Sequence, residues 1–324
     1  MMFERSLNYN DICVIPNYSE CKSRSFINLE TEFLGQKYAL PVAIANMGTL
    51  SNFLIMQKAI EYRIPIFWNR MIPIDRYIDS LKSGGPCDIN DMKKYIIPTV
   101  GINDSQFSVL DCLNTIGYPI ISIDVAHAHN KYVIEFVKKV KNSFDFKLIV
   151  GNIVTKEAAE DLRSAGADCL RINIGVGKVC STKLNTGVTR GTVTTILETK
   201  NIGLPIISDG GFICVADMVK SLGLGSTLCM TGQMFASCHE NSGVRFNVDG
   251  KIYTHYYGNA SKQSKRYANY PIKNIEGFSN PVLLDGSFDD VISNISDGLR
   301  SGASYIGVDN IDKISTKFVY EIIS

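Results

Sequence analysis

Net charge of either sign is almost absent from this 324-residue sequence, which carries 33 Lys and Arg against 32 Asp and Glu. The charged residues are spread along the chain, so there is no basic stretch of the kind that nucleic-acid binding requires. The N-terminus has no apolar run typical of a signal peptide, and no segment approaches the ~20 apolar residues of a membrane helix. We therefore expect a cytoplasmic protein that binds neither nucleic acid nor membrane.

A pair of cysteines in C-x-x-C spacing is also missing. The nine cysteines are scattered over positions 13, 21, 87, 112, 169, 180, 214, 229 and 238. An odd, dispersed set in so long a chain argues against a disulfide scaffold or a zinc knuckle and favours reduced thiols. Most of them are expected to be small, buried apolar residues.

From residue 41 onward, short apolar segments alternate with segments of helical periodicity. Strands are expected at 41–46, 64–68, 95–100, 119–125, 146–150, 168–174, 204–208 and 226–231, and helices at 52–62, 73–82, 105–116, 130–143, 155–165 and 215–222. Such alternation implies a parallel sheet with right-handed crossovers. A count of eight uniformly apolar strands favours an α/β fold of the closed (β/α)₈ TIM-barrel type over an open doubly wound sheet.

Two regions fall outside this repeat. Residues 3–40 predict a leading segment with minor strands. Residues 236–286 predict a flap and hairpin excursion after the eighth strand, with strands at 244–248 and 252–257 and a polar stretch at 258–277, before a closing helix at 289–301. A polar excursion this long inside a barrel is either functional or disordered. The whole chain, residues 1–324, is expected to form one (β/α)₈ catalytic domain.

Polar and glycine residues stand where the predicted strands end. They are Asn46, Asn69-Arg70, Gly101, Asp124, Gly151-Asn152, Gly175 to Gly177, Asp209 to Gly211 and Thr231-Gly232. The C-terminal ends of barrel strands share one face, and that face carries the active site of barrel enzymes.

The loop after the sixth strand reads Gly175-x-Gly177-x-x-Cys180, with a hydroxyl following at Thr182. Glycines let the backbone approach a ligand closely. The pattern is no dinucleotide fingerprint, because Cys180 replaces the third glycine and Glu198 falls late in a helix. Cys180 is either one more core thiol or, on this face, a nucleophile near backbone donors that lower a thiol pKa.

Two further loops have the composition of phosphate sites. Asp209-Gly210-Gly211 follows the seventh strand and Thr231-Gly232-Gln233 follows the eighth. Barrels commonly bind phosphate here through backbone N–H groups and a short helix. Two tight turns remain the alternative interpretation, while Asp209 could bind ribose hydroxyls as carboxylates do elsewhere.

Three other features predict no separate chemistry. His127 and His129 have no third metal ligand at a usual spacing. His239-Glu240 lacks the second histidine of a zinc-protease helix. Trp68, the sole tryptophan, is expected to pack.

Several ordered motifs together resemble the IMP dehydrogenase/GMP reductase family. They are Leu7-Asn-Tyr-Asn-Asp-Ile12, Pro41-Val-Ala-Ile-Ala-Asn-Met47, Gly151-Asn-Ile-Val-Thr155, Ala165-Gly-Ala-Asp168, Gly175-x-Gly-x-x-Cys-x-Thr182, Ser208-Asp-Gly-Gly211, Tyr257-Gly-Asn-Ala-Ser261, Glu276-Gly277 and Gly298-Leu-Arg-Ser-Gly-Ala-Ser-Tyr305. The resemblance covers nearly the whole chain and implies the TIM barrel independently.

The lengths of two segments distinguish the dehydrogenases from the reductases of this family. Residues 83–94 leave no room for the CBS modules of typical dehydrogenases, and the 258–276 flap is short, as in reductases of Gram-positive type. Three departures affect fine contacts. Arg266-Tyr267 is similar to a water-activating pair of the dehydrogenases, Asn69 replaces the usual His, and Asn46 to Thr49 varies a ligand loop.

The resemblance implies NADPH-dependent reductive deamination of GMP to IMP and ammonia, through a covalent thioimidate on Cys180 with Thr182 and Glu276 relaying a proton. Implied substrate-binding residues are Asn46, Asp209, Gly210, Gly211, Gly232, Gln233, Tyr257, Gly258, Asn259, Ser261 and Gly277. Arg70, Asp124, Ala126 and Gly175 are implied for the cofactor, and Gly175, Gly177 and Cys180 for a monovalent cation such as K⁺. A homotetramer is usual in the family.

Three alternatives remain at this point. The first is a short IMP dehydrogenase that oxidises IMP to XMP with NAD. The second is another phosphate-binding barrel enzyme, such as a flavin-dependent oxidoreductase, which the cysteine loop disfavours. The third is a catalytically silent nucleotide-binding barrel, against which Cys180, Thr182 and Glu276 argue.

Overall fold

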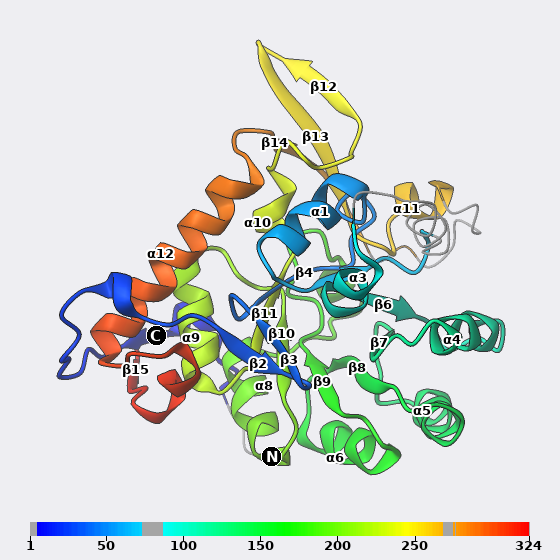
Figure 1. The fold of residues 1–324 in the computed structure, drawn as a ribbon, viewed down its shortest axis with the longest axis horizontal. Helices are drawn as coiled ribbons and strands as arrows, with labels where there is room; N and C mark the ends of the chain where they lie inside the picture. Colours follow the sequence, from blue (N-terminus) through cyan, green and yellow to red (C-terminus); the bar gives the residue numbers. More distant parts are fainter. Residues whose placement is uncertain (1–4, 73–86, 268–274, 276, 324) are drawn as a thin grey trace.

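A closed barrel of parallel strands forms the centre of the molecule (Figure 1). The computed structural model describes residues 5–72, 87–267, 275 and 277–323. The barrel strands are β4 (Val42–Ile44), β5 (Ile66–Trp68), β6 (Ile96–Val100), β7 (Ile120–Asp124), β8 (Lys147–Ile153), β9 (Cys169–Ile172), β10 (Ile206–Asp209) and β11 (Leu228–Thr231). Each pairs with the next along the chain, and β11 closes onto β4. The predicted (β/α)₈ fold is confirmed.

Alternate residues of these short strands face opposite sides of the sheet, which divides the core in two. Side chains such as Ala43, Phe67 and Ile97 fill the barrel interior. The hairpin of β2 (Thr31–Phe33) and β3 (Gln36–Tyr38) adds Phe33 and Tyr38 to this inner cluster. Two of the minor strands expected in the leading segment, β2 and β3, therefore pack side chains into the barrel interior.

Helices pack around the barrel, and their first residues are largely those that the sequence indicated. They include α1 (Phe53–Glu61), α4 (Gln106–Thr115), α5 (Lys131–Ser143), α6 (Lys156–Ala165), α8 (Thr192–Thr199) and α9 (Val215–Leu224). A 3-10 turn, η3 (Lys200–Ile202), follows α8. Asn52, Asn130 and Thr155 cap α1, α5 and α6 through their side chains, satisfying N–H groups that a helix start leaves free.

Some helices of the described residues were not expected from the sequence, and α3 (Ile89–Tyr95) is the one that leads directly into a barrel strand, β6. It begins after Asp88, whose side chain accepts from Asn90 N–H. Only Met92 and Tyr95 of this helix are buried, so it lacks the apolar stripe that predicts a helix from sequence. The helix expected at 73–82 lies outside the described residues.

The excursion after β11 contains more regular structure than expected. Following α10 (Gln233–Ala236), β12 (Arg245–Val248) and β13 (Lys251–Tyr257) form a hairpin that projects from the barrel (Figure 1). β14 (Ser279–Leu283) adds a third strand against β13, and α11 (Lys262–Tyr267) lies between them in sequence. Pro281 obscured β14, because proline is tolerated at a sheet edge but breaks a strand pattern.

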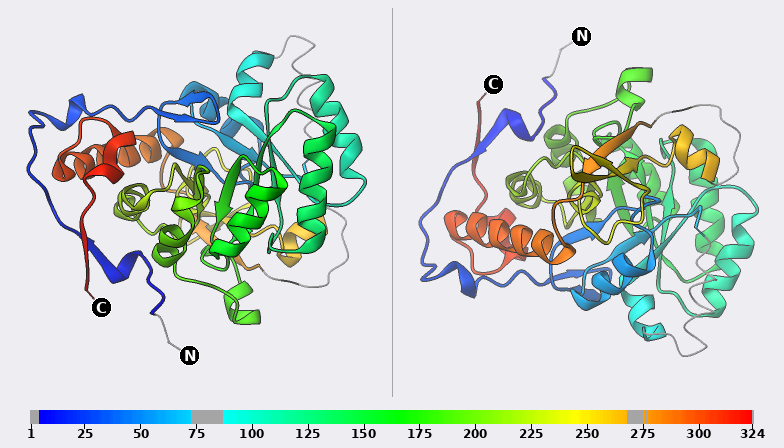
Figure 2. Two further views of the ribbon diagram at one scale, coloured as in Figure 1. Left: turned by 90° about the horizontal axis from the view of Figure 1, so that it is seen from below. Right: turned by 90° about the horizontal axis from the view of Figure 1, so that it is seen from above.

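Segments from the two ends of the chain pair with one another (Figure 2). β1 (Ile12–Val14) is antiparallel to β15 (Tyr320–Ile322). Short 3-10 turns flank them at η1 (Tyr9–Asp11), η2 (Arg24–Phe26) and η4 (Ile311–Thr316). The closing helix α12 (Phe288–Ile306) is longer than the 289–301 expected, starting after a Ser287 cap and ending at Gly307.

Two expectations about composition are also tested by the fold. All nine cysteines are free thiols, but only Cys169, Cys229 and Cys238 are buried, so the expectation that most would be buried was wrong. Trp68 is buried and donates from its indole N–H to the Ile72 carbonyl, as its packing role requires. Among the described residues, no helix is long and apolar enough to cross a membrane.

Helix α12 lies against α9 through two glycines, and this contact generates a test of the fold. A Cβ at Gly298 or at Gly302 would lie 2.5 Å from a methyl group of Val215 or of Val219, respectively. We expect Gly298→Leu to lower the free energy of unfolding by ~1–3 kcal/mol through overpacking, as measured by urea denaturation. Asn294→Leu, at an exposed position of the same helix, is the control and should change it by under ~0.5 kcal/mol. Equal effects would contradict the packing described.

Candidate active site

A buried guanidinium, that of Arg171 in β9, lies at the centre of the polar cluster at the C-terminal ends of the strands. Its Nε and Nη2 atoms lie 2.9 and 2.8 Å from Asp209 Oδ2, and Nη1 lies 3.3 Å from Asp124 Oδ1. Asp124 ends β7 and Asp209 ends β10. One cation therefore joins two of the residues that the sequence predicted for ligand binding.

Two asparagines complete this cluster. Asn46 donates from Nδ2 to Asp124 Oδ2 at 2.8 Å and accepts from Arg171 at 3.1 Å. Asn152 donates to Asp209 Oδ2 at 2.9 Å. Asn46, Asp124, Asn152 and Asp209 come from four strand ends, so the prediction that these ends share one polar face is confirmed.

Electrostatics keep the central side chain charged. Burial of the Arg171 guanidinium favours its neutral form, but the charges of Asp124 and Asp209 and the hydrogen bond to Asp209 outweigh this, so the pKa of Arg171 is raised above its ordinary value. The backbone is fitted closely around it. A Cβ at Gly151, in neighbouring β8, would lie 2.3 Å from the Arg171 carbonyl oxygen. Only glycine fits at that position.

The importance of Arg171 was missed in the sequence, where it stands inside an apolar alternating run. The signal was nevertheless present. Arginine is almost never fully buried unless its charge is paired, and β9 is a buried central strand. A single arginine in such a strand predicts carboxylates on the same barrel face.

The loop after β9 presents a thiol and a hydroxyl to each other. Cys180 Sγ donates to Thr182 Oγ1 at 3.3 Å, and the Cys180 N–H bonds to the Gly177 carbonyl at 2.9 Å. Thr182 begins the short helix α7 (Thr182–Thr186). Cys180 is half-buried, whereas desolvation raises the pKa of the buried Cys229 and Cys238 thiols to about 12. Cys180 is thus a partly accessible thiol on the polar face.

The loop of the predicted nucleophile, residues 175–182 and called the nucleophile loop, meets the segment that follows β13. Gly277 forms isolated bridges with both Cys180 and Ser261, and Phe278 N–H donates to the Val179 carbonyl at 2.8 Å. Gly258 packs on the same carbonyl, which would lie 3.2 Å from a Cβ there. The structure therefore brings the predicted nucleophile beside three predicted substrate residues. Glu276 lies outside the described residues.

The two predicted phosphate loops lie on the same side. Gly210 and Gly211 have φ of +75° and +81°, a backbone conformation that glycine adopts readily, and a Cβ on Gly210 would lie 3.5 Å from the Gly177 Cα. The Gly210 N–H already bonds to the Met230 carbonyl. Gly232 lies against the Tyr256 hydroxyl, 2.2 Å from where a Cβ would be. Within the described ranges, the buried Oε1 atom of Gln233 has no hydrogen-bond partner.

The residues predicted for a cofactor are brought together only in part. Arg70 donates to the Asp124 carbonyl at 3.2 Å, and its guanidinium covers Gly101. Ala126 is exposed just beyond β7. Gly175, with φ of +77°, begins the nucleophile loop and packs against Lys183 and the Val188 carbonyl, which follow that loop. Tyr257 is placed with its ring against Gly48, on the loop after β4.

The two histidines of the loop after β7 contact Asp161 and each other. His129 Nε2 lies 3.0 Å from Asp161 Oδ2, and the His127 ring contacts the His129 ring. No group of three His, Cys, Asp or Glu side chains that could hold a metal ion occurs among the residues that the structure describes.

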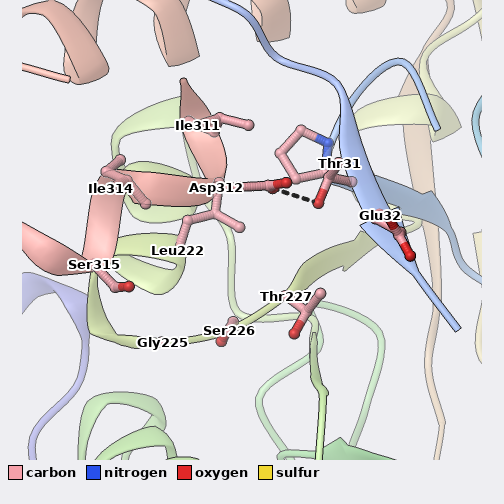
Figure 3. Close-up of a pocket in the computed structure, with 11 residues that line it drawn as sticks. Thr31, Glu32, Leu222, Gly225, Ser226, Thr227, Ile311, Asp312, Ile314 and Ser315 are labelled. Atoms are coloured by element: carbon pink, nitrogen blue, oxygen red, sulfur yellow. Dashed lines mark hydrogen bonds between the residues drawn. The ribbon is translucent and has the colours of Figure 1, made fainter. Parts of the chain in front are cut away.

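A cavity of about 220 Å³ lies at the other end of the barrel (Figure 3). Its lining comes from β2, α9 and η4 and from residues 226–227, which precede β11. Thr31 donates across it to Asp312 at 2.6 Å. It holds none of the predicted site residues and is smaller than the ~300 Å³ of typical ligand pockets.

Comparison with known proteins agrees with the geometry. Residues 6–324 match the IMP dehydrogenase / GMP reductase domain. GMP reductases from Bacillus licheniformis and Lacticaseibacillus casei are each 33% identical to the chain, over 96% and 98% of its length and 94% of theirs. The GMP reductase of Bacillus subtilis is 33% identical over 97% of both chains.

Removal of the central cation tests the cluster. Arg171→Met leaves two partly buried carboxylates without their counter-ion, and we expect the free energy of unfolding to fall by ~3–5 kcal/mol in urea denaturation. The control is Arg190→Met, which breaks the more exposed Arg190–Glu198 pair and should cost under about half as much. An Arg171→Met variant no less stable than Arg190→Met would rule out the central role of Arg171.

Proposed function

The chain belongs to the IMP dehydrogenase/GMP reductase family, and we propose that it is a GMP reductase, converting GMP to IMP and ammonia with NADPH. The observation that carries this proposal is the Cys180–Thr182 pair at 3.3 Å, on the face where the nucleophile loop meets Gly277 and Ser261. The relatives named above support the reductase direction, since each is named a GMP reductase.

In the proposed reaction the Cys180 thiolate attacks C2 of the purine, and ammonia leaves to give a thioimidate. Hydride addition at C2 then expels the thiolate and yields IMP. A covalent intermediate divides one difficult displacement into two easier steps. The reduced nicotinamide, when bound, supplies the hydride, so that GMP, NADPH and two protons balance IMP, ammonium and NADP⁺.

Ammonia leaves only after its nitrogen is protonated, which requires a donor beside C2. Thr182 Oγ1 lies 3.3 Å from the sulfur and therefore close to any carbon bonded to it. Glu276 is the proposed partner of Thr182 in this relay. The next residue in the sequence, Gly277, bridges to Cys180, which supports this assignment.

Binding of the nucleotide is assigned to the loops around the cysteine. Asp209 Oδ2 is occupied by Arg171 and Asn152, which leaves Oδ1 to accept from ribose hydroxyls. The phosphate is assigned to the 232–233 loop, Gly211 and the Tyr257–Ser261 segment. Gln233 supports this assignment, because its buried Oε1 has no hydrogen-bond partner among the described residues, and a half-turn of the side-chain amide would place the Nε2 donor there for an anion. Gly210, whose N–H is already bonded to Met230, would contribute its conformation only.

The cofactor is assigned to the opposite side of the cluster. Arg70 and Asp124 contact each other there, and Ala126 leaves the loop after β7 open. The carbonyls of Gly175, Gly177 and Cys180 are proposed to hold a monovalent cation. Carbonyl oxygen suits such an ion, and the Gly177 carbonyl, which accepts from Cys180 N–H, has a second lone pair for it. We also propose one catalytic domain and a homotetramer.

One observation favours a second candidate, a short IMP dehydrogenase. Arg266-Tyr267 ends α11, in the stretch where dehydrogenases carry a water-activating pair. In that case IMP would be oxidised to XMP with NAD⁺.

The absorbance band of reduced nicotinamide separates the two candidates. We expect its loss with GMP plus NADPH and no change with IMP plus NAD⁺. The reverse pattern would identify a dehydrogenase. Silence in both mixtures would support a nucleotide-binding protein without activity and overturn the proposal.

Replacing the nucleophile tests the chemistry more directly. We expect Cys180→Ala to lower turnover by at least ~10³-fold, because the covalent step is lost, while calorimetry still detects GMP binding. Cys214→Ala is the matched control, since Cys214 is an exposed thiol at the start of α9 outside the proposed site. Full activity of Cys180→Ala would exclude the thioimidate mechanism.

A further inference from the structure

Three asparagines from separate parts of the chain meet at the barrel mouth. Asn46 follows β4, Asn69 follows β5 and Asn259 follows β13. Asn69 Nδ2 donates to the Asn46 carbonyl at 2.8 Å and to Asn259 Oδ1 at 2.7 Å. Asn259 Nδ2 donates in turn to the Asn46 carbonyl at 3.1 Å. The three residues form a closed hydrogen-bonded group.

Backbone atoms fix the orientation of both amide side chains. The Met71 N–H donates to Asn69 Oδ1 at 2.8 Å, so the Nδ2 atom of Asn69 must face the other way. The Asn46 carbonyl can only accept, which sets Nδ2 of Asn259 toward it and Oδ1 toward Asn69. Both N–H bonds of the Asn69 side-chain amide therefore donate to protein acceptors, and Asn69 itself is 1% exposed.

Asn46 is engaged in the same way. Its side chain donates to Asp124 and accepts from Arg171, while its carbonyl accepts from the other two asparagines. The sequence placed Asn46 and Asn259 among the ligands. The Asn46 side chain bonds to Asp124 and Arg171, and the Asn259 side chain bonds to the Asn46 carbonyl and to Asn69.

This group anchors the segment that the proposed function assigns to the nucleotide. Asn259 lies in Tyr257–Ser261, and Ser261 bridges Gly277, which also bridges Cys180. The Asn69 N–H is held in turn by Ser51 Oγ at 2.9 Å. A displacement of Asn259 would therefore reach the nucleophile loop through Gly277.

We propose that Asn69 is a positioning residue, which acts through Asn259 to hold the Tyr257–Ser261 segment where GMP binds. The inference rests on the proposed function for the identity of the nucleotide. It assigns no ligand contact to Asn69, whose effect on binding is transmitted wholly by Asn259.

A double-mutant cycle on the full chain tests this transmission. Loss of buried hydrogen bonds should weaken GMP binding by about 10- to 100-fold in Asn69→Ala and in Asn259→Ala, as measured by calorimetry. Because both variants break one linkage, the double variant should bind GMP within about threefold of the weaker single variant. Multiplication of the two single effects would overturn the proposal.

Asn52→Ala is the matched control. Asn52 caps α1 and bonds to the Thr49 and Glu240 carbonyls, with no hydrogen bond to the 257–261 segment. Its loss should lower thermal stability and leave the dissociation constant for GMP within about twofold of wild type. A purely structural role of Asn69 would make the Asn69→Ala variant behave like this control.

Amide hydrogen exchange without nucleotide separates this inference from the proposed function. Asn69→Ala should speed exchange at Gly258 and Ser261, whose N–H groups bond to Phe278 and Gly258, by at least about tenfold relative to Asn52→Ala. Unchanged exchange would refute the positioning role. If wild type fails to bind GMP, the proposed function fails, and the exchange result still decides the role of Asn69.

Discussion

The buried charge of Arg171 is the constraint on which the polar face depends. A guanidinium removed from water needs carboxylates around it, and Asp124 and Asp209 supply them from β7 and β10. This requirement fixes the relative heights of three strands at their C-terminal ends. The close fit of Gly151 beneath the Arg171 backbone and the donation from Asn152 follow from the same arrangement. Asp124 and Asp209, which we propose as binding groups, thus share one electrostatic centre.

The barrel could be predicted from sequence because its signals are local. Alternating apolar strands, the caps Asn52, Asn130 and Thr155, and the glycines at strand ends each act within a few residues. Elements held by distant contacts could not be predicted in this way. α3 has only two buried residues, and β14 is recognisable only beside β13. The nine cysteines were judged by residue type, whereas their burial depends on which helix faces turn outward.

The candidate site follows the same division. Loops could be placed on one face because the barrel topology places them there, so the sequence predicted that Cys180, Thr182 and the 209–211 loop lie on that face. Individual roles depend on which hydrogen bonds are already used. The Gly210 N–H is already bonded to the Met230 carbonyl, and the Asn259 amide is bonded to Asn46 and Asn69. A sequence motif does not reveal these hydrogen bonds. The sequence indicates that an arginine in the buried strand β9 needs a carboxylate partner, but only the fold shows that its partners are Asp124 and Asp209.

The pairing of β1 with β15 has a consequence for the order of events on the ribosome. Ile12 pairs with Ile322, so a strand made at the beginning must wait for nearly the whole polypeptide before it finds its partner. Seven of the eight strand pairs of the barrel join consecutive barrel strands, and only the closing pair of β11 with β4 joins strands far apart in sequence. Contacts of long sequence separation form late, because a large loop must close first. By this argument the β1–β15 pair, like the closing β4–β11 pair, can form only late in synthesis.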